Sequence, residues 1–464
     1  MGKVTGFLEY VREENPAEKP LERIGSFREF HTELEEKKRR EQGGRCMNCG
    51  VPFCQSVFGC PLHNLIPEWN DEIFSGNWKH ALARLLKTNS FPEFTGRVCP
   101  ALCETACVCG MDDIRKAVTV RDNELALIEY AWEHGLITPC PPAVRTGKKV
   151  AVIGSGPSGL AAADMLNRRG NQVVVFERDD RAGGLLMYGI PNMKLDKEII
   201  LRRIRKMEEE GILFRCNTEV GTALPGEELL REYDAVVLCC GAREPRTVAG
   251  TDLSVSGVFS ALDYLTASTK TVVFGEGDPC SAENRNVIVI GNGDTATDCV
   301  ATAIRQKARS VTQLVRKPKA EDLQRVWPYR SKAEKQEYGH EEAAAAYGKD
   351  PRLYESTVSR LLTGKTGKLT GVIIRQKGEE RKLPADMLLI AAGFSGIEEN
   401  TAKAFGLSAD DRGRIGNSDF RTGQQKVFAC GDARRGPSLV AWAIAEGRAC
   451  AKEVDCFLEG YTNL

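Results

Sequence analysis

The distribution of cysteine is the feature that most constrains this chain of 464 residues, which contains 17 of them. Seven lie in two groups near the N-terminus, namely Cys46, Cys49, Cys54 and Cys60, then Cys99, Cys103 and Cys107. The first residues have no apolar signal core, so the cysteines favour metal ligation over disulfides. Only one pair has the C-x2-C spacing of a zinc knuckle, and no histidine pair is nearby. Iron–sulfur ligation is therefore favoured, with zinc as the alternative.

The number of thiols leaves one ligand position open. Each cubane cluster takes four protein ligands, so two clusters need one ligand more than the two groups supply. Cys109 is one candidate, although its closeness to Cys107 would crowd two side chains. Glu124 is the other, although the residues alone favour a solvated glutamate at the start of a helix over a ligand. They do not decide which residue is the eighth ligand.

Two strand–loop–helix patterns follow a proline-rich linker at residues 138–142. Alternating and continuous apolar runs predict the elements of both patterns. The predicted strands are 149–153, 172–177, 286–290 and 310–316; the predicted helices are 64–87, 120–137 and 159–169. Residues 320–365 are predicted to be a surface helix or an excursion within the second unit, and the charge run 33–41 a solvated helix face.

A glycine-rich loop joins the first strand to its helix. Gly154, Gly156 and Gly159 permit a tight turn, the close approach of a pyrophosphate and the packing of helix on strand, and Pro157 lies in the same loop. Glu177 ends the next strand, where an acid bonds ribose hydroxyls. The loop, the helix and the acid together predict a site for FAD.

Two further segments are predicted to contact the flavin. Gly184 and Leu185 belong to a segment with paired glycines, which lets the backbone approach the flavin ring. Gly431 and Asp432, near the C-terminus, fit an aspartate that bonds the ribityl chain or phosphate. Because this predicted flavin contact follows the second glycine-rich loop in sequence, the first dinucleotide fold is expected to be interrupted by the second.

The second loop predicts a nicotinamide site. Its candidate residues are Gly291, Gly293, Asp294 and Thr295. The following strand ends in Arg316 and Lys317 and not in an acid. A base at this place favours the 2′-phosphate of NADPH over NADH.

These patterns predict an α/β protein with two Rossmann-like dinucleotide-binding domains, one inserted in the other, after an α-helical iron–sulfur domain. The predicted limits are 1–145 for the iron–sulfur domain, 146–280 and 386–464 for the FAD-binding domain, and 281–385 for the NADPH-binding domain. The formal net charge is zero, so no nucleic-acid partner is expected. No apolar run is long enough to span a membrane, and the expected compartment is the cytoplasm.

Several blocks of the chain resemble a known family. They are residues 1–10, 49–54, 59–70, 96–104, 188–191, 294–299 and 434–440. These blocks are similar to the small (beta) subunit of bacterial NADPH-dependent glutamate synthase. All but the N-terminal block are shared with dihydropyrimidine dehydrogenase and related oxidoreductases. The chain departs from the family in a longer spacer between Cys54 and Cys60, an additional Cys109, and Pro437 at a position expected to be polar.

The resemblance implies one FAD, one NADPH site and two 4Fe–4S clusters. One cluster would take Cys46, Cys49, Cys54 and Cys107; the other would take Cys60, Cys99, Cys103 and Glu124. No catalytic side chain is implied, because FAD carries the chemistry. Electrons would pass from NADPH through FAD and the clusters to a large (alpha) subunit that makes L-glutamate from 2-oxoglutarate and glutamine. The alternative is an NADPH oxidoreductase linked to ferredoxin or sulfur.

Overall fold

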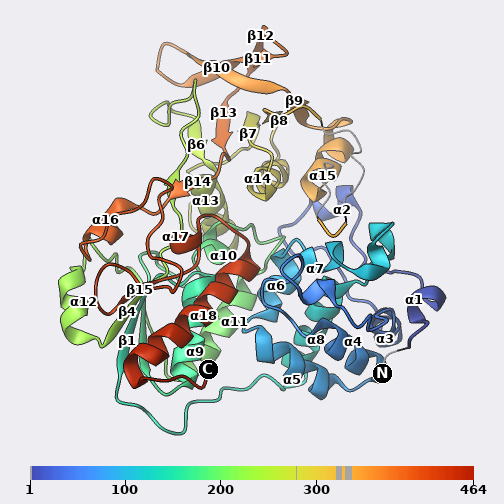
Figure 1. Cartoon of the computed structure of the whole chain (residues 1–464). Helices are drawn as coiled ribbons and strands as arrows, with labels where there is room; N and C mark the ends of the chain where they lie inside the picture. The colour runs from blue at the N-terminus through green and yellow to red at the C-terminus, as the bar shows by residue number, and fades with distance from the viewer. Residues whose placement is uncertain (1–2, 278, 320–326, 330–336) are drawn as a thin grey trace.

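The computed structural model describes residues 3–277, 279–319, 327–329 and 337–464. They form two α/β units with a helical unit beside them (Figure 1). The helical unit, drawn in blue, shares one hydrophobic core with the first α/β unit. The predicted α/β fold class, with a helical unit at the N-terminal side, is confirmed.

The first sheet is parallel throughout, and a strand from far along the chain completes it. Its strand order is β15 (Val427–Ala429), β4 (Ala235–Leu238), β1 (Lys149–Ile153), β2 (Gln172–Phe176) and β3 (Leu213–Arg215). The central strands are rich in valine and isoleucine, and these side chains are buried on both faces of the sheet, as parallel sheets require. Because β15 follows the second unit in sequence, the first unit is interrupted by the second.

Two long helices lie together against this sheet. They are α9 (Pro157–Arg168) and α18 (Val440–Glu459). Their backbones approach closely at Gly447, where a Cβ would collide with the carbonyl oxygen of Ser158. The other helices of the unit are α10 (Leu185–Tyr188), α11 (Lys197–Glu209), α12 (Gly226–Glu232), α16 (Glu399–Lys403) and α17 (Asp432–Arg435).

The second sheet is also parallel and extends beyond the predicted limits 281–385 at both ends. Its order is β6 (Val258–Ser260), β13 (Met387–Ile390), β7 (Asn286–Ile290), β8 (Ser310–Val315) and β9 (Arg352–Tyr354). Helices α13 (Ala261–Phe274), α14 (Asp294–Arg305) and α15 (Tyr338–Tyr347) pack on it. Beyond it lie the antiparallel strands β10 (Ser356–Thr363), β11 (Leu369–Gln376) and β12 (Glu379–Pro384) (Figure 1). A short ladder pairs β5 (Glu244–Pro245) with β14 (Phe394–Gly396).

Helix α15 differs from the predicted surface helix. Glu342 is fully buried, and it accepts hydrogen bonds from Arg305 and from Arg23 of the N-terminal segment. The rest of the described part of 320–365 continues into β9 and β10. Residues 320–326 and 330–336 of that prediction lie outside the described residues.

The helical unit consists of short helices joined by the cysteine-bearing loops. They are α1 (Gly6–Glu9), α2 (Pro20–Arg23), α3 (Glu36–Gly44), α4 (Ile66–Ser75), α5 (Trp78–Thr88), α6 (Pro92–Val98), α7 (Leu102–Thr105) and α8 (Val120–Glu133). The predicted helix 64–87 is two helices, because Gly76 adopts the left-handed conformation, φ +77°, and ends α4. The predicted helix 120–137 ends at Glu133. No described helix is both long and apolar enough to cross a lipid bilayer.

The charge run 33–41 is not wholly solvated. Arg39 of α3 is 1% exposed. Its guanidinium donates to the side-chain oxygens of Asn15 and Asn123. The prediction of a solvated face was therefore wrong for this residue, since the polar partners that bury it come from distant segments.

Candidate cofactor sites

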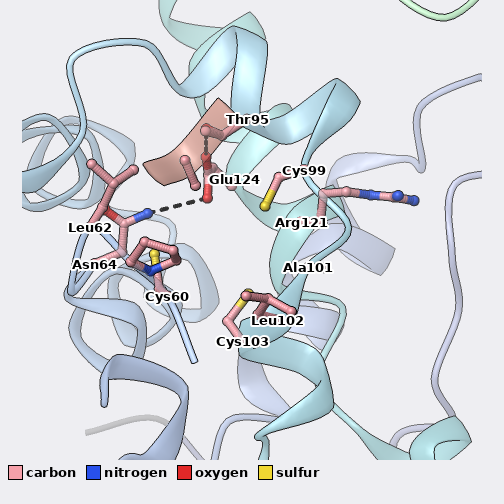
Figure 2. Close-up of a pocket in the computed structure, with 12 residues that line it drawn as sticks. Cys60, Leu62, Asn64, Thr95, Cys99, Ala101, Leu102, Cys103, Arg121 and Glu124 are labelled. Carbon is pink, nitrogen blue, oxygen red and sulfur yellow. Dashed lines mark hydrogen bonds between the residues drawn. The ribbon is translucent and has the colours of Figure 1, made fainter. Parts of the chain in front are cut away.

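Three thiols and one carboxylate surround a cavity in the helical unit (Figure 2). Cys60, Cys99, Cys103 and Glu124 are named the inner set. Cys99 follows α6, Cys103 lies in α7, and Glu124 lies in the first turns of α8. Ala441 of α18 also lines the cavity. The cavity therefore lies where the helical unit meets the first α/β unit.

Glu124 is held in place by side chains from three segments. It is 6% exposed, so it is not a solvated glutamate. Asn89 and Asn64 donate to its carboxylate at 3.1 and 3.4 Å, and the Thr95 hydroxyl donates to it as well. Burial raises the pKa of Glu124 to about 7 against these three hydrogen bonds. Sequence analysis missed its three partners, which carry no motif.

The inner set has the donor chemistry that an iron–sulfur cluster needs. Burial raises the pKa of Cys60 to about 12 and that of Cys99 to about 11, so a thiolate needs a cationic partner there. Iron supplies that charge, and cysteine sulfur is its usual cluster ligand. Among the described residues, no three His, Cys, Asp or Glu side chains come close enough to hold a single metal ion. The residues present fit a cluster.

The second group of thiols lies nearer the surface. Cys46, Cys49, Cys54 and Cys107 are named the outer set. Burial raises the pKa of Cys46 to about 12, and the charges of Cys107 and Cys49 act in the same direction, so these thiols lie together. Cys49 is exposed, whereas Cys54 and Cys107 are buried.

Cys109 lies with the outer set and does not line the inner cavity. A hydrogen bond between its thiol and that of Cys107 lowers the pKa of Cys107. Of the two candidates for the open ligand position, only Glu124 faces Cys60, Cys99 and Cys103.

The first glycine loop is built as its spacing predicts. Gly154 has φ +99°, and a Cβ there would lie 2.5 Å from the carbonyl oxygen of Cys239. A Cβ at Gly159 would collide with the carbonyl oxygen of Gly154. A Cβ at Gly156 would meet no atom within 4 Å, so this glycine faces open space. Pro157 is the first residue of α9, whose N-terminus thus points at the space where phosphates would bind.

Glu177 lies directly beside this loop. It is 3% exposed and accepts hydrogen bonds from the backbone N–H of Ser155 at 3.0 Å and from its hydroxyl at 2.5 Å. Gly184 adjoins the loop from the other side, since a Cβ there would lie 2.9 Å from the Cα of Gly156. Leu185 follows it as the first residue of α10. The acid and the paired glycines therefore gather at one place.

The C-terminal flavin candidates reach the same loop. A Cβ at Gly431 would lie 2.5 Å from the hydroxyl of Ser158. Asp432 begins α17 and accepts a hydrogen bond from Ser438 at 2.7 Å. Burial raises its pKa to about 6.

The second loop repeats this geometry. Gly291 lies close to the carbonyl oxygen of Ala391, and a Cβ at Gly293 would meet nothing within 4 Å. Asp294 and Thr295 are exposed in the first turn of α14. Arg316 and Lys317 are exposed just past the end of β8, the neighbour of β7.

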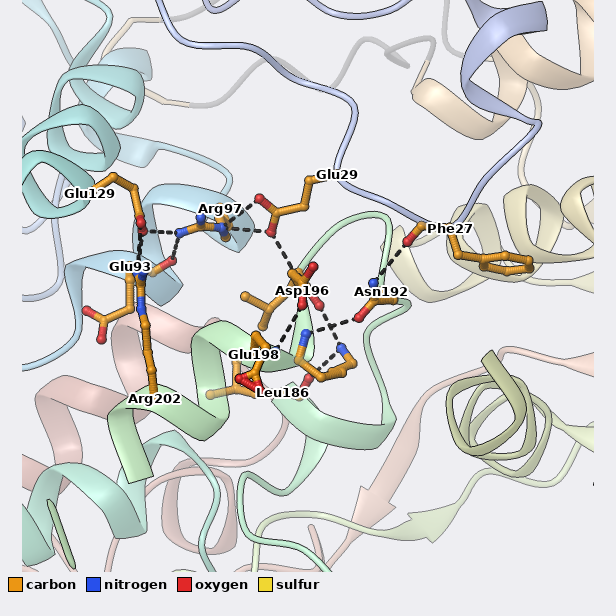
Figure 3. Close-up of polar contacts among 12 residues, drawn as sticks. Phe27, Glu29, Glu93, Arg97, Glu129, Leu186, Asn192, Asp196, Glu198 and Arg202 are labelled. Carbon is orange, nitrogen blue, oxygen red and sulfur yellow. Dashed lines mark hydrogen bonds and ion pairs between the residues drawn. The ribbon is translucent and has the colours of Figure 1, made fainter. Parts of the chain in front are cut away.

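Ion pairs fix the helical unit against the first α/β unit (Figure 3). Glu129 of α8 accepts from Arg97 of α6 at 2.7 Å and from Arg202 of α11 at 2.6 Å. Arg97 also bonds Glu29, which accepts the backbone N–H of Asp196 at 2.9 Å. No sequence motif marks these residues, because each partner lies in a different segment.

Lys197 is hydrogen-bonded to the backbone of the segment that follows Gly184. Its ammonium is fully buried and donates to the backbone carbonyls of Leu186, Ile190 and Leu195 at 3.0, 2.6 and 2.9 Å. Burial lowers the pKa of this lysine to about 7. Sequence analysis missed it, because a lysine in an amphipathic helix is ordinarily solvated.

Comparison with known proteins matches both parts of this arrangement. The pyridine nucleotide-disulphide oxidoreductase family matches residues 148–447, and dihydropyrimidine dehydrogenase domain II, 4Fe-4S cluster, matches residues 23–136. The glutamate synthase [NADPH] small chain of Bacillus subtilis is 46% identical over 495 residues, covering 100% of both chains. Glutamate synthase [NADH] of Schizosaccharomyces pombe is 42% identical and contains all of this chain within 23% of its own length. FprA of Mycobacterium tuberculosis, solved in complex with NADPH, shares the fold over 68% of this chain and 85% of its own, with TM-score 0.54 and 18% identity.

Proposed function

The chain belongs to the family of glutamate synthase small chains, and we propose that it passes electrons from NADPH through FAD and two 4Fe–4S clusters to a large subunit that makes L-glutamate from 2-oxoglutarate and glutamine. One observation carries the proposal. The inner set surrounds a cavity that is also lined by Ala441 of α18, the helix that follows Gly431 and Asp432. The proposed thiol ligands therefore adjoin the helix that follows the predicted flavin contacts in sequence.

The residues divide this task between binding and positioning. When bound, FAD accepts a hydride from NADPH, and the clusters carry electrons singly. We propose that the outer set holds one cluster and the inner set, including Glu124, holds the other. The open faces of Gly156 and Gly293 would admit the pyrophosphates of FAD and NADPH. Glu177 and Asp432 would orient FAD, while Gly184 and Leu185 would lie against its ring.

The nicotinamide preference follows from charge. Arg316 and Lys317 are exposed beside the second loop, where two cations favour a 2′-phosphate. We therefore propose NADPH as the preferred donor. Relatives named for NADPH and for NADH both occur, so the preference has to be measured.

The large subunit is the proposed partner. The relative from Schizosaccharomyces pombe contains this whole chain within a much longer polypeptide, which supports function next to a larger protein. The proposed units are residues 1–145 for the clusters, 146–280 with 386–464 for FAD, and 281–385 for NADPH, with the correction that β6 and β13 belong to the sheet of the NADPH unit. The cytoplasm is the proposed compartment, because a reducing environment keeps the thiols available for iron.

Anaerobic purification tests the proposal. Iron, sulfide and flavin would be quantified, and NADPH would then be titrated while the visible spectrum is recorded. We expect about eight irons per chain, together with FAD that bleaches on addition of NADPH. Zinc in place of iron would overturn the assignment of the helical unit. Transfer to a small ferredoxin but not to the large subunit would favour the ferredoxin-linked alternative.

A further inference from the structure

Arg45 lies at the junction between α3 and the first cysteine of the outer set. It follows Gly44, the last residue of α3, and precedes Cys46. Arg45 is 3% exposed. Its guanidinium donates to the backbone carbonyls of Tyr10 and, at 2.6 Å, of Lys116. Both acceptors are uncharged, so neither neutralises the cation.

No carboxylate compensates this charge among the described residues. The Nε–H of Arg45 is buried and has no hydrogen-bond partner there. The charged groups that act on Arg45 are the thiols of Cys109 and Cys107 and the guanidinium of Arg12. Arg12 is a cation, and its repulsion makes the buried charge of Arg45 still less favourable. A buried charge without a counter-charge costs free energy, so the position calls for an anion on the thiol side.

Other buried arginines in the same region have such a partner. Arg12 forms ion pairs with Glu14 and Glu104, both at 2.7 Å. Arg97 forms ion pairs with Glu29 and Glu129. Arg39 forms no ion pair within the described part of the chain, but the carboxylates of Asp122 and Glu33 act on it, whereas only thiols and another cation act on Arg45.

We propose that Arg45 is the buried counter-charge of the cluster held by the outer set and that it raises the reduction potential of that cluster. Thiolate ligands give such a cluster a net negative charge, and each electron it accepts adds one more. A fixed cation in a low-dielectric site stabilises the reduced form more than the oxidised form. Net charge around a cluster is one of the factors that set its potential. Arg45 therefore acts on the cluster through its charge. It donates to backbone carbonyls and is not itself a ligand.

This inference rests on the proposed function, because it requires a cluster at the outer set. The test is an EPR-monitored redox titration of the intact, iron-loaded chain and of Arg45→Gln. We expect one cluster signal to move to more negative potential by at least a tenfold change in its reduction equilibrium, which is 59 mV for a one-electron couple. The other signal should stay within that limit. The signal that moves should be the one that Cys49→Ser also alters.

Two variants separate charge from packing. Arg45→Lys keeps the cation, so its potential should stay near the wild-type value. Arg39→Gln is the matched control, because Arg39 is equally buried and also has an unpartnered Nε–H, but the charges acting on it are those of Asp122 and Glu33. It should shift neither signal.

Each remaining outcome is decisive. Unshifted signals in Arg45→Gln would overturn the role of Arg45, and so would equal shifts in Arg45→Gln and Arg45→Lys. If Arg45→Gln loses the outer cluster while Arg45→Lys keeps it, the requirement for charge is supported; if both lose it, the role is packing and the inference fails. A wild-type chain without iron–sulfur signals would instead refute the proposed function.

Discussion

The inner and outer cysteine sets share their thiol chemistry but differ in what surrounds them. The inner set is enclosed, contains the carboxylate of Glu124 and adjoins Ala441 of the first α/β unit. The outer set lies beside the buried cation of Arg45 and reaches the surface at Cys49. One set therefore adjoins the first α/β unit, and the other reaches solvent, where a partner protein can approach. Under the proposed function, the places of the two sets in the fold, more than their ligands, would assign them to the two ends of an electron path.

Removal of an inner thiol should have the largest effect. Cys103 is 8% exposed and lines the inner cavity. A serine oxygen is a harder ligand than a thiolate, so we expect Cys103→Ser to lower the iron content from about eight to about four per chain. NADPH should still bleach the flavin, but electrons should no longer reach the outer set. Iron analysis and EPR spectra after NADPH addition measure both effects.

The control for this variant is Cys140→Ser, which changes an exposed thiol in the linker and should leave iron and spectra unchanged. Full iron content and a wild-type spectrum in Cys103→Ser would break the assignment of the inner set.

The next largest effect should come from the carboxylate that distinguishes the inner set. Glu124→Ala removes the only group other than the thiols that we propose as a ligand, so the inner-set EPR signal should change and iron should be lost from that set. Cys109→Ala should leave the inner-set signal unchanged, because Cys109 lies beside Cys107 of the outer set. The reverse pattern would make Cys109 the eighth ligand.

The loops and strands could be predicted because they depend on neighbouring residues. Strands at 149–153 and 286–290 have the predicted bounds. A glycine at position 159 is required by the close approach of the Gly154 carbonyl within one strand–turn–helix unit, and such a contact is encoded by short spacing. Gly76, by contrast, divides a segment that was predicted to be one helix. The prediction missed the break because the apolar pattern continues across it.

The environment of the sites could not be predicted in the same way. Glu124 is buried because Asn64, Asn89 and Thr95 converge on it from three separate segments. The strands β6 and β13 join the second sheet through pairings that skip a long stretch of sequence. Local patterns carry no information on which distant segments meet, so the residues could only name Glu124 as a candidate, and family resemblance was needed to favour it as a ligand.

A change at the interface between the helical unit and the first α/β unit should have a moderate effect on stability. Its effect on electron transfer should be confined to the inner set. Glu129 is 12% exposed and pairs with two arginines. Glu129→Gln leaves both cations without a full counter-charge, so we expect a loss of about 2–3 kcal/mol in the free energy of unfolding. Transfer from flavin to the inner set should also slow, because α11 would hold the helical unit less firmly.

Urea denaturation and stopped-flow spectroscopy measure these effects. Glu198→Gln is the matched control on α11, since the pair of Glu198 with Arg205 is exposed and should be worth less than about 1 kcal/mol. Equal losses in the two variants would contradict a positioning role for Glu129.

The smallest effect on the two cysteine sets should come from a change at Arg316, which is proposed to bind the nicotinamide cofactor and not a cluster. Arg316→Ala removes a cation proposed to bind the 2′-phosphate, and a charge-assisted hydrogen bond contributes about 1.5–3 kcal/mol. The KM for NADPH should therefore rise roughly 10- to 100-fold, while the KM for NADH and the EPR signals of both sets stay unchanged. Arg309→Ala, at the opposite end of β8, is the control and should alter neither constant. Equal changes for NADPH and NADH would remove the 2′-phosphate contact, whereas a change in either cluster signal would show that the nicotinamide end and the two sets are coupled.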